Sequence, residues 1–113
     1  MNKDFADFQR YFKEYQRKFG LTGYQVYFKY EPLEKAFARL VANQGEVVAT
    51  VTLSSVLLDK DKPFKDIRRD AKHEALHLLI NRLGANGRYR YSSEAEIYEA
   101  EEELVVKLED LIP

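Results

Sequence analysis

A helix is predicted for residues 64–83, which read FKDIRRDAKHEALHLLINRL. Apolar residues recur there at the three- and four-residue spacing of an amphipathic helix, and Gly84 is typical of a helix end. The middle of this helix carries His73, Glu74 and His77 in the pattern HExxH. These are the only two histidines of the chain, and they lie four residues apart, or about one helical turn.

HExxH on a helix is the pattern of a metalloprotease site. Four residues make slightly more than one turn, so the imidazoles of His73 and His77 project from one face at a separation that suits tetrahedral Zn²⁺. Glu74 lies about 100° round the helix from His73 and can act as general base on a water acidified by the metal. We therefore expect His73 and His77 to bind zinc and Glu74 to be catalytic. The alternative is a pair of half-exposed histidines without a metal.

A catalytic zinc needs a third protein ligand, which must here be a carboxylate because the chain has no other histidine and no cysteine. The last predicted helix is rich in glutamate. On a helical wheel, Glu101 falls within an apolar stripe, where a buried carboxylate needs a cation. The stripe is formed by Ile97, Leu104, Val105, Leu108, Leu111 and Ile112. Glu101 is therefore the predicted third ligand.

Other assignments of the third ligand stay open. Glu94 lies near the same stripe but in the first turn, and Glu102 lies farther round the helix. Without a metal, Glu101 would need a salt bridge to an arginine such as Arg39 or Arg82.

Zinc proteases also need a donor for the oxyanion of the tetrahedral intermediate. The loop between the histidine-bearing helix and the glutamate-rich helix carries Tyr89 and Tyr91, with Arg88 and Arg90. Tyr98 lies on the flank of the glutamate-rich helix. Tyr89 and Tyr91 are the predicted oxyanion or substrate contacts, although each could equally pack that loop on the surface.

The whole chain, residues 1–113, is predicted to form one α+β domain with the order α-β-β-β-α-α. Aromatic residues spaced three and four apart predict the first helix, and Ser93 with Glu96 forms a capping box for the last. The three strand-like runs are predicted to form an antiparallel meander, with Asn43-Gln44-Gly45 as its second turn. The strands are predicted at residues 24–30, 36–41 and 47–53.

Composition narrows the function. The 113 residues are 45% hydrophobic and 33% charged, with a net charge of −1. This balance gives no global attraction to nucleic acid or to an anionic membrane, so neither is an expected partner. There is no cysteine, no apolar leader and no membrane-length apolar run, which favours a cytoplasmic protein.

These features resemble the minimal gluzincin peptidases, or minigluzincins, and similar small HExxH proteins of phages and prophages. The resemblance rests on HEALH at residues 73–77 and on the glutamate helix YEAEEELVVKLE at residues 98–109. It implies a zincin-like fold, a zinc-dependent endopeptidase and a form that is often latent. Gluzincins often place a histidine-orienting carboxylate four residues after the ligand glutamate, a spacing that only Glu99 with Glu103 offers here.

The favoured function is a zinc metallopeptidase that binds an extended peptide or protein segment along an exposed edge of the sheet. One alternative is a catalytically silent regulatory or interaction protein of mobile-element origin that keeps a metal for stability. Another is a metal hydrolase that is not a peptidase, for which Arg88 and Arg90 would have to handle a phosphate.

Overall fold

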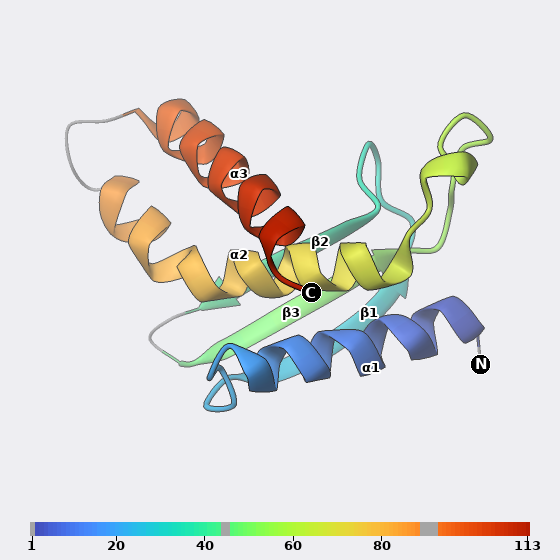
Figure 1. Cartoon of the computed structure of the whole chain (residues 1–113), viewed down its shortest axis with the longest axis horizontal. Coiled ribbons are helices and arrows are strands. Elements are labelled where there is room, and N and C mark those ends of the chain that lie inside the picture. The colour runs from blue at the N-terminus through green and yellow to red at the C-terminus, as the bar shows by residue number, and fades with distance from the viewer. Residues whose placement is uncertain (1, 44–45, 89–92) are drawn as a thin grey trace.

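The computed structural model describes residues 2–43, 46–88 and 93–113, without the side chains of residues 82 and 84–88. The predicted α+β order is confirmed (Figure 1). Over these residues no helix has both the length and the apolar character needed to cross a bilayer. The elements are α1 (Lys3–Lys18), β1 (Gln25–Glu31), β2 (Ala38–Asn43), β3 (Val48–Ser54), the 3₁₀ helix η1 (Lys62–Phe64), α2 (Ile67–Arg88) and α3 (Glu94–Leu111).

The sheet is mixed, so the predicted antiparallel meander is wrong in one pairing. β2 and β3 pair antiparallel as predicted, with Leu40 opposite Val51. β1 instead runs parallel to β3, with Phe28 opposite Val51, and the strand order is β1-β3-β2. Gln44 and Gly45, predicted for the turn, lie outside the described residues.

The central position belongs to the most apolar strand. Ala49, Val51 and Leu53 of β3 are buried, whereas the outer strands carry the exposed charges of Lys29 and Arg39. Charged side chains are readily solvated on an edge strand, and they discourage pairing with other chains. A meander would have placed β2, with Arg39, in the centre. The actual order leaves β2 as an edge.

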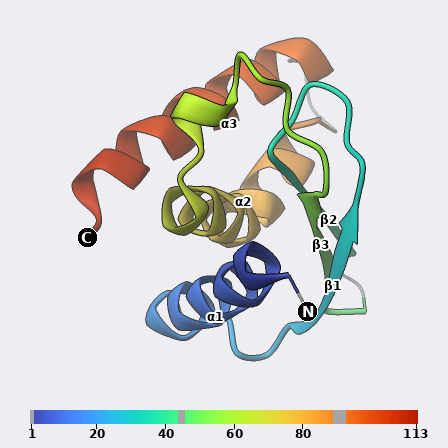
Figure 2. The same cartoon turned by 90° about the vertical axis from the view of Figure 1, so that its right-hand side faces the viewer.

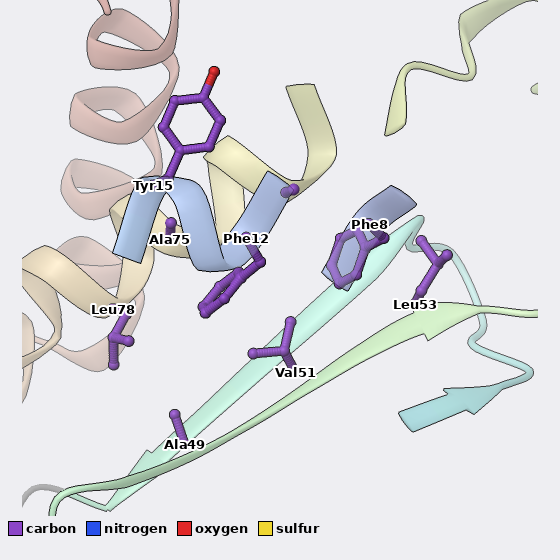
Figure 3. Packing of buried hydrophobic residues seen from close by; sticks show 9 residues of the cluster. Phe8, Phe12, Tyr15, Ala49, Val51, Leu53, Ala75 and Leu78 are labelled. Carbon is purple, nitrogen blue, oxygen red and sulfur yellow. The ribbon is translucent and has the colours of Figure 1, made fainter. Parts of the chain in front are cut away.

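Helices α1 and α2 cover one face of the sheet (Figure 2). The aromatic stripe predicted for α1 is confirmed, because Phe8, Phe12 and Tyr15 are fully buried. Phe8 and Phe12 lie over Val51 and Leu53 of the central strand, and Ala75 of α2 belongs to the same cluster (Figure 3). This shared core fixes the position of α2 relative to the sheet.

The actual bounds of α2 differ from the prediction. The helix starts at Ile67 and continues through Gly84 to Arg88, because a glycine inside a helix costs only about 1 kcal/mol relative to alanine. Among its described side chains, the buried apolar ones are Ala71, Ala75, Leu76 and Leu78.

Helix α3 is held at both ends. Ser93 caps its start as predicted, and its Oγ accepts a hydrogen bond from the Glu96 amide at 3.1 Å. The last turn has no basic residue of its own, but Lys72 of α2 donates to the backbone carbonyls of Glu109 and Ile112. A cation at a helix C-terminus is favourable. Lys72 therefore fastens the end of α3 to α2.

The face of α3 that meets α2 follows the predicted apolar stripe only in part. Leu104 and Leu111 are 39% and 77% exposed, whereas Val105 and Glu109 are buried. Val105 and Ile112 belong to the predicted stripe, and Ile112 packs against the core, so the contact face overlaps the stripe but is turned toward Glu109. The reason is polar pairing, because the glutamates on this face contact the histidines of α2.

Candidate metal centre

A cavity of about 550 Å³ lies between the outer strand β2, helix α2 and helix α3. Its lining combines the segment 35–40 with the polar face of α2 and the glutamate face of α3. All three residues of the HExxH pattern line it. The residues contributed by the helices are Asp70, His73, Glu74, His77, Asn81, Tyr98, Glu101 and Glu102.

The two histidines lie close together, as the helical spacing predicts. The Nε2 atoms of His73 and His77 are 3.2 Å apart. Two nitrogens bound to one tetrahedral zinc at about 2.0–2.1 Å would be about 3.3 Å apart, so this separation fits a shared metal. One candidate ligand atom from each of His73, Glu74 and His77 lies within 4.8 Å of the others. These three residues can therefore hold a metal ion.

A carboxylate contacts the other ring nitrogen of each histidine. His73 Nδ1 lies 2.6 Å from Oε2 of Glu109, a residue only 6% exposed, and the other oxygen of Glu109 lies 2.7 Å from Arg69. His77 Nδ1 lies 3.3 Å from Oε1 of Glu101. A carboxylate only accepts hydrogen bonds, so a neutral ring whose Nε2 bound a metal would keep its proton on Nδ1. In that tautomer the Nε2 atom of each ring presents a lone pair.

Glu102 completes a set of acceptors around one point. Its Oε1 lies 2.6 Å from His77 Nε2, and its Oε2 lies 3.6 Å from His73 Nε2. Two lone pairs and a carboxylate converge, which is unfavourable unless a cation lies between them. Either an added proton or a metal ion would satisfy the group. The donor set of two imidazoles and one carboxylate fits a divalent metal.

Glu74 is almost buried beside this group, at 6% exposed. Burial, with a smaller contribution from the Glu102 carboxylate, raises the pKa of its carboxyl to about 7, although the neighbouring His73 lowers it. A group with a pKa near 7 both takes up and releases protons at neutral pH. Glu74 therefore has the properties of a general base and acid.

Comparison with family models, curated proteins and solved structures finds no match. The assignment of this site therefore rests on its geometry and on the HExxH pattern.

The glutamates considered for the third ligand differ in where they lie relative to the histidines. Glu101 is nearly buried, with its side chain 11% exposed, and meets His77 through Nδ1 rather than Nε2. Glu102 faces both Nε2 atoms. Glu94 is exposed in the first turn of α3. Glu99, whose spacing to Glu103 matched the gluzincin pattern, is also exposed.

The predicted oxyanion donors Tyr89 and Tyr91 lie outside the described residues, as do Arg90 and the side chains of Arg82 and Arg88. Tyr98 is a described tyrosine that lines the cavity, and Arg39 lines it from β2.

Sequence reasoning missed Glu109, which follows Glu102 by seven residues, or about two turns, on the same helical face.

Proposed function

We propose that this chain is a zinc-dependent endopeptidase of the gluzincin type, with His73, His77 and Glu102 as metal ligands. The convergence of both Nε2 atoms and a Glu102 oxygen, next to Glu74, carries this proposal. Glu102 replaces Glu101 as the proposed ligand because Glu101 lies on the opposite ring nitrogen of His77. Glu101 and Glu109 then orient the two rings through their Nδ1 protons.

A divalent metal, when bound, acts as a Lewis acid that makes water more acidic. In the proposed reaction Glu74 takes a proton from the attacking water, whose oxygen bonds to the peptide carbonyl carbon. Glu74 then delivers that proton to the leaving amine nitrogen as the carbon–nitrogen bond breaks. Its burial and its pKa of about 7 suit both transfers.

The substrate in this proposal is a peptide segment bound as an additional strand. β2 is an edge of the sheet, and the segment 35–40, which includes its first residues, lines the same cavity as Glu74. The free backbone groups of an edge strand pair with an extended peptide and hold its carbonyls next to the helix. Tyr98, on the cavity wall, is a candidate oxyanion donor alongside the predicted Tyr89 and Tyr91.

The test of the reaction is the Glu74→Gln variant, assayed on unfolded casein and on a mixture of fluorogenic peptides. We expect zinc binding to be retained and cleavage to fall by at least about a hundredfold, the scale of losing a general base. The control is Glu103→Gln, which removes an exposed carboxylate paired only with Lys107 among the described side chains. Equal cleavage by Glu74→Gln and the control would reject Glu74 as the base.

The third ligand is tested by zinc affinity. Glu102→Ala should lower it more than Glu101→Ala, because Glu102 contributes the ligand and Glu101 only orients His77. The reverse order would restore Glu101 as the ligand and reject our reassignment.

A second candidate function is a metal-stabilised interaction protein without peptidase activity. It is favoured by the distribution of the site over two helices, since a metal held by His73 and His77 of α2 and Glu102 of α3 would also fasten α3 in place. This candidate would be selected if zinc stabilised both the wild type and Glu74→Gln and neither protein cleaved any peptide. The latent form implied by the minigluzincin resemblance stays a prediction.

A further inference from the structure

A second cavity, of about 330 Å³, adjoins the candidate metal centre. Phe37 and Asp70 line both cavities, so they form the boundary between the two. Asp70 precedes Glu74 by four residues on α2, a rise of about 6 Å along the helix. A side chain that enters the second cavity would therefore belong to a residue close to the bond that Glu74 acts on.

The walls of the second cavity are largely apolar. They include Tyr30, Leu53, Val56 and Ile67. This surface suits the methylene stem of a long side chain.

Two lysines also line the second cavity, but both are already paired. Lys65 Nζ lies 3.0 Å from Asp4, and Lys62 Nζ lies 2.7 Å from Asp59. Their charges are thus largely balanced by neighbouring carboxylates.

Asp70 is the remaining charged group of this cavity. Among the side chains that the structure describes, none forms an ion pair or hydrogen bond with its carboxylate. Burial, together with the neighbouring Asp66 carboxylate, raises the pKa of Asp70 to about 7, although His73 and Arg69 lower it. A carboxylate in such a place is stabilised by any cation that reaches it.

We propose that the second cavity is a specificity subsite for a lysine or arginine side chain of the peptide substrate, with Asp70 as the residue that receives the cationic head. The inference rests on the proposed peptidase function and specifies its substrate class. The apolar walls hold the stem, and Asp70 distinguishes a cationic side chain from an apolar one of the same length.

The test begins with cleavage-site mapping by mass spectrometry on a proteome-derived peptide mixture. Lysine or arginine should be enriched at one position next to the cleaved bond. Matched peptides with lysine or norleucine at that position then isolate the charge. We expect about a ten- to a hundredfold higher kcat/KM for lysine, the range given by one hydrogen bond to a charged group.

Asp70→Asn should reduce that preference to within about twofold of unity and leave the norleucine peptide cleaved, while Glu34→Gln should keep the preference. Glu34 is an exposed acid on the neighbouring loop, so its variant makes the same charge change outside both cavities. Asparagine removes a carboxylate that is costly to bury, so this variant should fold, and Asp70→Ala provides a second check. Lysine and norleucine peptides are also compared for binding to the Glu74→Gln protein by calorimetry.

The outcomes separate the inference from the function on which it rests. Cleavage without preference for a basic residue overturns the subsite alone, as does a lysine preference that survives in both Asp70 variants. If the wild type cleaves no peptide and binds none, the proposed peptidase function is overturned, and the subsite falls with it.

Discussion

Replacement of Glu109 tests whether this buried carboxylate supports the metal centre. We expect Glu109→Gln to weaken zinc binding by about tenfold and Glu109→Ala by up to about a hundredfold, the range found for residues that orient a metal-bound histidine. These factors correspond to about 1.4 and 2.7 kcal/mol.

The local contacts place this loss at His73. Glu109 accepts from Nδ1 of His73 at 2.6 Å and also pairs with Arg69. Without Glu109, Arg69 still keeps Asp110, at 2.8 Å. The guanidinium therefore retains a partner, whereas the Nδ1 proton of His73 loses the carboxylate that fixes its position.

The measurement is a competition titration of zinc against a fluorescent chelator, and the matched control is Asp110→Asn. Asp110 pairs with the same Arg69, is 61% exposed in its side chain and adjoins Glu109 in sequence. The control should bind zinc within about twofold of wild type. Zinc affinities that are equal in Glu109→Ala and Asp110→Asn would refute the orienting role of Glu109.

Two further predictions concern stability. Lys72→Met should lower the free energy of unfolding by about 1–3 kcal/mol, because the carbonyls of Glu109 and Ile112 lose a charged donor; urea unfolding would show no change if Lys72 does not fasten α3. Asp70→Asn should stabilise the chelator-treated protein at pH 8 by about 1–2 kcal/mol, allowing for water that reaches the carboxylate. The folded-state pKa of Asp70 is raised from 3.8 to about 7, so the stabilising contribution of its protonated carboxyl is fully present below pH 3.8 and is lost as the pH rises through 7. The gain from Asp70→Asn should therefore shrink between pH 8 and pH 4, and a gain that is constant over this range would contradict the assignment.

The features that the sequence predicts well are local ones. The aromatic spacing of α1, the Ser93 cap of α3 and the HExxH geometry each depend on residues within a few turns of one another. Helical periodicity and capping chemistry are enough to infer them.

The features that the sequence does not reveal depend on distant partners. A turn signal pairs β2 with β3, but no local signal indicates that β1 lies parallel to β3. The wheel likewise places Leu104 toward the core, whereas α3 turns Glu102 and Glu109 toward the histidines. Burying leucine competes there with pairing of charged groups across α2 and α3, and the pairing prevails. A wheel ranks the faces of one helix and carries no information about this competition.

The most direct test of the metal centre is the metal content of the protein purified without chelator, measured by inductively coupled plasma mass spectrometry. The proposed site predicts about one zinc per chain in the wild type and a large loss in His73→Ala, with Glu103→Gln unchanged. A zinc-to-protein ratio far below one, and the same in His73→Ala, would contradict the existence of the site.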